Sequence, residues 1–160
     1  MTAWGTRPYD NDEAASFAVR LDALPPEDHD AFIRTALTRE PAELRRHWQE
    51  AVAAAAVVAV QCPTGRLLDI GYGPARPVAA LPTDLRSHAA AALALVSEGQ
   101  HDTDSPASAT LHALWRARTA SLRETLITDS APSPAQVPGS MHLPPVRPHT
   151  TTGPRRTLAP

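Results

Sequence analysis

The sequence predicts an all-α fold, a compact bundle of about five helices around a central alanine-rich helix, with a disordered proline-rich C-terminal tail. Apolar residues recur at the spacing of one helix face in five stretches, and proline or glycine bounds most of them. Alanine and valine fill residues 51–60, so neighbouring helices can approach this stretch closely. We therefore expect one helical domain over residues 1–128 and a separate tail over residues 129–160.

The first helix should begin near Asp10, because Asp10 and Glu13 have the spacing of a capping box, and run to about Leu24. Its expected apolar face consists of Ala14, Phe17, Ala18, Leu21 and Leu24. Two prolines then end it, and a second helix should cover residues 27–38.

The third helix carries the strongest helical pattern, and we expect it to run without a break from Pro41 to Cys62. Proline is favoured at the first position of a helix because its missing N–H has no partner there anyway. One face is formed by Leu44, Trp48, Ala51, Val52, Ala55, Ala59 and Cys62. Further valines make the helix apolar on most sides, so it should be the buried centre of the domain.

Residues 66–82 should be irregular, because they contain three prolines and two glycines. Leu67, Leu68 and Ile70 could still form a short strand there. A fourth helix should follow Thr83 as its cap, and a fifth should open at Ser105-Pro106. The fifth helix carries Leu111, Leu114, Trp115, Leu122 and Leu126.

The charge and the apolar pattern argue against several classes of partner. The formal net charge is -2, which does not favour non-specific binding to nucleic acid or to anionic membranes. The longest apolar run, residues 51–60, is too short to span a bilayer. A single cysteine, Cys62, and the lack of a secretory signal lead us to expect a cytoplasmic protein. We expect an unidentified protein partner and leave the oligomeric state open.

The residues that could carry chemistry favour structural roles. The acidic run at residues 10–13 lacks the alternating ligands of a calcium loop, so helix capping explains it. Cys62 ends an apolar stripe, as a small core residue would. None of the histidines forms a pair at metal-binding spacing; they are His29, His47, His88, His101, His112, His142 and His149. We therefore predict no catalytic residue, no cofactor and no metal site.

One segment offers an alternative, because residues 67–75 are similar to the first motif of S-adenosylmethionine-dependent methyltransferases. In those enzymes an apolar strand ends in Asp-x-Gly-x-Gly, and a helix follows at once. Here Asp69, Gly71 and Gly73 have that spacing, but Arg76-Pro77 follows them where a helix should start. We favour a turn-rich loop, and titration with S-adenosylmethionine would separate the two readings.

The N-terminus carries a second resemblance. Trp4-Gly5, Pro8-Tyr9, Asn11-Asp12 and the later alanine-rich helix resemble the bacterial family called domain of unknown function 4259. The Leu114-Trp115 pair is similar too, and the resemblance covers residues 1–128. Its structural signature is Trp4, Gly5, Pro8, Tyr9, Asn11, Asp12, Trp48 and Trp115. Arg7 stands where the family tends to have a second glycine, and Ala56 where a glutamate is common.

The resemblance implies a small cytoplasmic helical domain and carries no activity with it. We interpret the chain as a non-enzymatic interaction or regulatory module. The acidic stretch from Asp10 to Asp30 is a candidate docking face for a basic partner, although helix-start charges explain most of it. The alternative function is a small methyltransferase-like enzyme that uses Gly71 and Gly73.

The aromatic signature should anchor the core, since few other large side chains are present. We predict that Trp4→Ala lowers the free energy of unfolding by about 3–5 kcal/mol if the ring is fully buried. A thermal melt that the substitution leaves unchanged would instead place Trp4 on a recognition surface.

Overall fold

The computed structural model describes residues 5–98 and 106–129. In these segments the chain forms six α-helices, two short 3-10 helices and no strand. The α-helices are α1 (Asp12–Ala23), α2 (His29–Leu37), α3 (Pro41–Arg46), α4 (Trp48–Val60), α5 (Leu85–Glu98) and α6 (Pro106–Thr128), and the 3-10 helices are η1 (Pro26–Asp28) and η2 (Thr64–Leu67). The predicted all-α fold is confirmed. The predicted tail and Trp4 lie outside the described residues.

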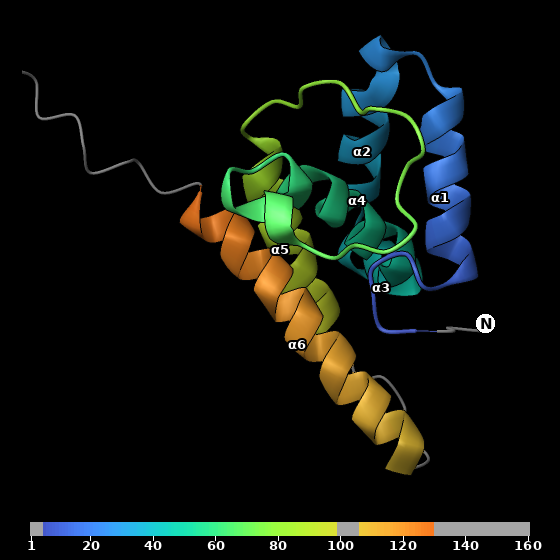
Figure 1. Ribbon diagram of the computed structural model, residues 1–160, viewed down its shortest axis with the longest axis vertical. Helices are drawn as coiled ribbons and strands as arrows, with labels where there is room; N and C mark the ends of the chain where they lie inside the picture. The colour runs from blue at the N-terminus through green and yellow to red at the C-terminus, as the bar shows by residue number, and fades with distance from the viewer. Residues whose placement is uncertain (1–4, 99–105, 130–160) are drawn as a thin grey trace, which may run out of the picture.

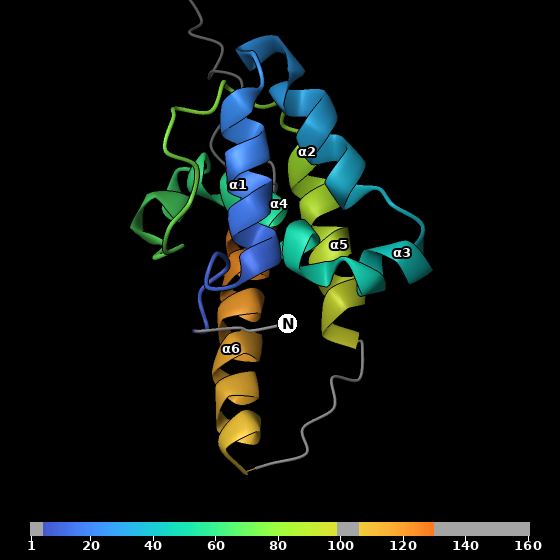
Figure 2. The same cartoon turned by 90° about the vertical axis from the view of Figure 1, so that its right-hand side faces the viewer.

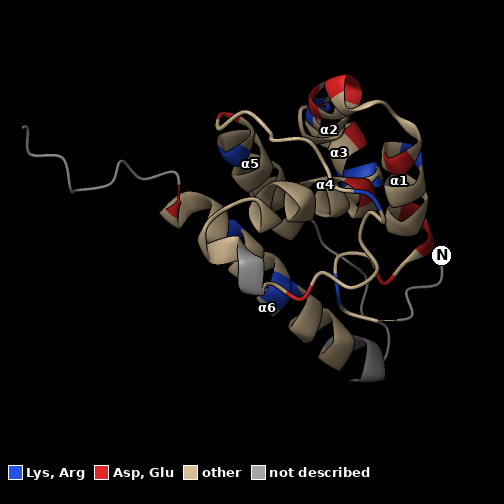
Figure 3. Ribbon diagram, turned by 45° about the horizontal axis from the view of Figure 1, so that its top comes forward, with Lys and Arg blue, Asp and Glu red and all other residues tan. Residues whose placement is uncertain are grey.

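The alanine-rich helix α4 lies at the centre of the bundle (Figures 1, 2 and 3). It contacts α1, α2, α3, α5 and α6, and every residue from Ala51 to Ala59 is buried. Helices with small side chains can approach one another to the short end of the usual interaxial range of about 8–10 Å. The position predicted for this helix is therefore confirmed.

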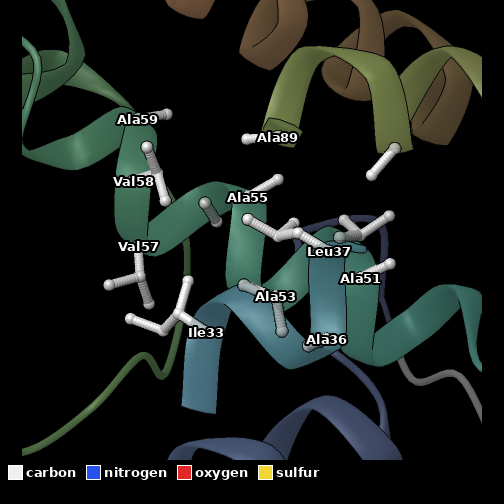
Figure 4. Packing of buried hydrophobic residues seen from close by; sticks show 14 of the residues in the cluster. Ile33, Ala36, Leu37, Ala51, Ala53, Ala55, Val57, Val58, Ala59 and Ala89 are labelled. Carbon is white, nitrogen blue, oxygen red and sulfur yellow. The ribbon is translucent and has the colours of Figure 1, made fainter. Parts of the chain in front are cut away.

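Two neighbours enclose α4 from opposite sides (Figure 4). Helix α2 presents Ile33, Ala36 and Leu37 to it, and α5 presents Ala89 from the other side. Larger side chains complete the core where α1, α5 and α6 meet the centre; they include Phe17, Leu21, Leu85, Leu93, Leu122 and Leu126. Alanine on the central helix and leucine on its neighbours together fill the interior without large side chains on both sides of an interface.

The expectation of one continuous helix from Pro41 to Cys62 is wrong. The backbone leaves helical geometry at His47, which has φ -109° and ψ 38° and separates α3 from α4. No proline or glycine stands at the break, so nothing in the local pattern indicates it. The break lets α3 pack against α5 while α4 enters the core.

Two helix starts also differ from the prediction. Asn11, not Asp10, caps α1, because its side-chain oxygen accepts a 2.8 Å hydrogen bond from the Ala14 N–H. Asp10 is instead turned back and accepts from the Arg7 N–H at 3.1 Å. Helix α5 begins at Leu85, after a turn in which the Arg86 N–H bonds to the Thr83 carbonyl.

Because the helices pack closely around α4, we predict that a larger side chain on this helix lowers the stability of the protein. Ala55 is fully buried, so Ala55→Leu should lower the free energy of unfolding by about 1–3 kcal/mol because no space exists for the extra atoms. Ala91 on α5 is exposed, and Ala91→Leu should change stability by no more than about 0.5 kcal/mol. Chemical denaturation measures both. Equal stabilities for the two variants would show that α4 is loosely packed.

Candidate functional site

The first described residues, 5–11, form a turn that we call the leader, and its anchor is Tyr9. The Tyr9 side chain is fully buried, and its hydroxyl donates a 2.9 Å hydrogen bond to the Ala53 carbonyl of α4. Burial, together with the negative charge of Asp22, raises the pKa of Tyr9 well above its ordinary value. The phenol therefore stays neutral and joins the leader to the centre of the bundle.

The leader also holds the long connection between η2 and α5, residues 68–84, which we call the strap. The Arg7 Nε atom lies 2.9 Å from Asp69 Oδ2, and this pair joins the two segments at the surface. Gly71 has φ +81° and lies against Arg7 and Asp10, where a Cβ would be 3.2 Å from each. A side chain at Gly71 would be strained by the backbone angle and would also crowd the leader.

The two glycines of the methyltransferase-like motif are therefore packed against the protein itself. A Cβ at Gly73 would lie 2.9 Å from Ile70 Cδ1 and 3.6 Å from the Tyr9 ring. Residues 68–70 form no strand, and within the described chain the next helix after them begins only at Leu85. The strand–glycine–helix geometry that cradles a nucleotide-like cofactor is not what these residues form.

Three side chains hold the rest of the strap, and they come from α1, from α2 and from the residue that follows α4. The Asp22 carboxylate accepts hydrogen bonds from the backbone N–H groups of Ala75 and Arg76, each at 2.9 Å. His29 is buried, and its Nδ1 atom accepts from the Ala79 N–H at 3.2 Å. The side-chain amide of Gln61 donates a hydrogen bond to the Ala79 carbonyl and accepts one from the Leu81 N–H. These bonds replace the missing helical ladder in a segment without regular structure.

A carboxylate at the start of α4 joins this helix to two further segments. Glu50 is paired with Arg20 of α1 and, at 2.6 Å, with Arg39 of the α2–α3 connection, while its own side chain is only 13% exposed. Burial raises the pKa of Glu50, but the hydrogen bonds and charges of the two arginines outweigh it, so the net pKa is lowered. Glu50 is thus a charged side chain with a structural role, because each of its carboxylate oxygens accepts a hydrogen bond from an arginine.

The signature aromatics of α4 and α6 meet. Trp48 and Trp115 contact edge to face, with ring centroids 4.9 Å apart, and His112 stacks on Trp115 at 5.8 Å. Trp115 lies one turn before Thr119, the first buried residue in the described part of α6. The remaining described signature residues belong to the leader and the start of α1, where Pro8 and Tyr9 are buried and Asp12 is exposed.

The fully buried side chains of the described part of α6 lie in its C-terminal half. Its buried residues Thr119, Leu122 and Leu126 all lie in that half, whereas no side chain from Thr110 to Arg118 is buried. We call residues 110–118 the α6 projection, because this part of the helix extends beyond the other helices (Figures 1 and 2). Leu111 and Leu114 are 54% and 52% exposed on it.

The α6 projection is also basic. Arg116 and Arg118 are exposed on it, Arg123 follows one turn later, and no acidic residue occurs between Pro106 and Arg123. Acidic side chains instead gather on α1, η1 and α2 (Figure 3). Part of the negative charge in this region is engaged within the protein, since the Asp22 carboxylate holds the strap and Asp30 pairs with Arg34 at 3.0 Å.

The remaining candidate reactive groups make structural contacts. Cys62 is buried, its Sγ donates to the Val58 carbonyl at 3.6 Å, and burial raises the pKa of its thiol. A raised pKa reduces the thiolate fraction that nucleophilic chemistry needs. Among the described residues no three acidic, histidine or cysteine side chains converge in metal-binding geometry. His101, His142 and His149 lie outside the described residues.

Two open hollows lie away from the leader. One, of about 520 Å³, runs between α5 and α6 and combines apolar Ala94 and Ile127 with charged Glu98, Arg123 and Glu124. The other, of about 270 Å³, lies between α4 and the strap, and its lining is mostly aliphatic. Neither brings together a nucleophile, a base and an oxyanion donor.

Comparison with known proteins places the chain in a family. Residues 2–125 match the family described as Domain of unknown function (DUF4259). The chain belongs to this family. The match includes the leader, the alanine-rich α4 and most of α6. Searches of curated proteins and of solved structures returned no match. No helix in the described parts of this DUF4259 protein has the length and apolar character of a membrane span.

The buried hydrogen bond of Tyr9 gives a prediction at neutral pH. Tyr9→Phe removes the hydroxyl that bonds Ala53 and should lower the free energy of unfolding by about 1–2 kcal/mol. Tyr72 is 77% exposed, so Tyr72→Phe is the matched control and should leave stability at pH 7 unchanged. Urea denaturation measures both variants.

The raised pKa of Tyr9 gives the same variant a pH signature. Above pH ~10 the unfolded tyrosine ionises while the folded one stays neutral, so wild-type stability should fall by about 1.4 kcal/mol per pH unit from this group. Tyr9→Phe lacks this loss. The stability difference between wild type and variant should therefore shrink as the pH rises above ~10, and parallel curves would contradict the burial of the phenol.

Proposed function

We propose that this DUF4259 protein is a non-enzymatic helical interaction module and that the α6 projection is its binding surface. The observation that carries the proposal is the contrast along one helix: α6 has buried side chains at Thr119, Leu122 and Leu126 and none over residues 110–118, although both stretches carry leucines. A helix that extends past the core with leucines about half exposed has unburied apolar area that a partner can cover.

The roles of the polar side chains support a binding module over an enzyme. Tyr9, Asp22, His29 and Glu50 have the chemistry for acid–base work, and each is engaged in holding segments of the chain together. A catalytic group needs an accessible polar atom in a cleft, aimed at a reacting atom. The geometry therefore favours recognition by a surface.

The domain boundary and the location are part of the same proposal. The family match ends at residue 125 and α6 ends at Thr128, which supports a domain over residues 1–128 and a separate tail. Asp129 still accepts a 2.8 Å hydrogen bond from the Thr64 hydroxyl, so the tail is best taken to begin one residue later. We assign the protein to the cytoplasm, and its single, buried cysteine fits a reducing compartment.

Capture from native cells tests the binding surface. Leu111→Gln with Leu114→Gln removes the exposed apolar groups and retains helix propensity, since glutamine is nearly as good a helix former as leucine. Ile127→Gln is the matched control, because Ile127 is 48% exposed on the same helix but outside the α6 projection.

Wild type and the control should enrich a common protein that the double variant loses by about tenfold or more, and all three should show the same thermal melt. A captured set that is identical for the three proteins would show that the α6 projection is not the binding surface.

A further inference from the structure

We propose that the α6 projection binds an acidic amphipathic helix of another protein. The inference rests on the proposed function and adds the chemistry of the partner. Its basis is the pattern of side chains on the projection, their charge, and the place where the helix leaves the bundle.

The spacing of the side chains favours a helix as the occupant. Leu111, Leu114 and Arg118 stand at i, i+3 and i+7, so they form one stripe along the helix. Trp115, at i+4, borders this stripe and packs on Trp48 of α4. Leu111 continues the face that buries Leu122 and Leu126 further along α6. The stripe therefore continues the helix-packing face of α6 beyond the helices that cover the rest of this face. A second helix fits it by the same ridge-and-groove geometry.

The positive charge of the projection favours a partner helix that is acidic. Arg118 lies on the same stripe as the leucines and Arg116 on the other side of the helix, and both side chains are exposed. Without acidic residues on this part of α6, a partner with glutamate or aspartate beside its apolar residues gains attraction, and a basic partner is repelled. A second copy that presents the same face would bring arginine toward arginine, so the charge favours a different chain.

The size of the apolar face argues against a lipid surface. The projection is about 13 Å long and exposes two leucines, far less than the apolar face of helices that lie in a membrane interface. A partner helix contributes its own apolar face to the same contact, whereas lipid gains only from the two leucines. The acidic residues on α1 and α2 also disfavour an anionic membrane (Figure 3).

A designed peptide tests the proposal. The probe is a fluorescein-labelled peptide of about 14 residues with leucines at helical spacing and glutamates elsewhere, and its matched control replaces every glutamate by lysine. Fluorescence anisotropy at low salt should show saturable binding of the acidic peptide to the full chain. The lysine peptide should bind at least about tenfold more weakly.

Two pairs of variants assign the binding to the α6 projection. Leu111→Gln with Leu114→Gln, and separately Arg116→Glu with Arg118→Glu, should each raise the Kd about tenfold or more. Ile127→Gln and Arg123→Glu, on the same helix outside the projection, should leave the Kd within about twofold. High salt of ~0.5 M should reduce the difference between wild type and the arginine variant. Thermal melts of all variants exclude unfolding as the cause.

The outcomes separate this proposal from the proposed function. Equal binding of the two peptides, or a Kd that the arginine variant leaves unchanged, overturns the acidic helix. Binding to vesicles of phosphatidylcholine and phosphatidylglycerol in equal parts, or self-association that the leucine variant abolishes, also overturns it. If the leucine variant loses a cellular protein that the arginine variant still captures, the binding surface stands and only the acidic partner is wrong.

Discussion

The burial of α4 from Ala51 to Ala59 constrains where the other helices can lie. Its side chains from Ala51 to Ala59 are alanines and valines, which are too short to reach outward and fill gaps. The backbones of the neighbouring helices must therefore lie close to α4, and α4 is in contact with α1, α2, α5 and α6. The leader also contacts α4, since the buried Tyr9 side chain donates a hydrogen bond to the Ala53 carbonyl. The large side chains of the core stand on the outer helices, where alanine on α4 leaves room for them.

This constraint explains how an irregular strap becomes an ordered part of the fold. Residues 68–84 carry little regular hydrogen bonding of their own, so other segments supply it. Asp22, His29 and Gln61 bond the backbone of the strap, and Arg7 pairs with Asp69. The glycines at 71 and 73 permit the leader and strap to touch. A motif that resembles a cofactor loop in sequence is thus a contact between two loops in space.

The same packing leaves α6 divided into two parts with different roles. Its C-terminal half completes the core, and the Trp48–Trp115 contact closes the bundle near the division. Beyond that point the helix keeps its apolar spacing but has left the helices that bury it. Apolar spacing indicates that a helix has a packing face; it does not say whether that face is covered within the chain.

The sequence by itself determined the helical class, the central alanine-rich helix and the approximate limits of most helices, because these depend on local spacing, proline and capping residues. Tertiary structure decided the break at His47, the choice of Asn11 over Asp10 as the cap, and the meeting of Tyr9 and Gly73. Each of these depends on residues far apart in the chain or on competition between two similar side chains. The exposure of Leu111 and Leu114 belongs with them, since a leucine's burial is fixed by what lies opposite it in space.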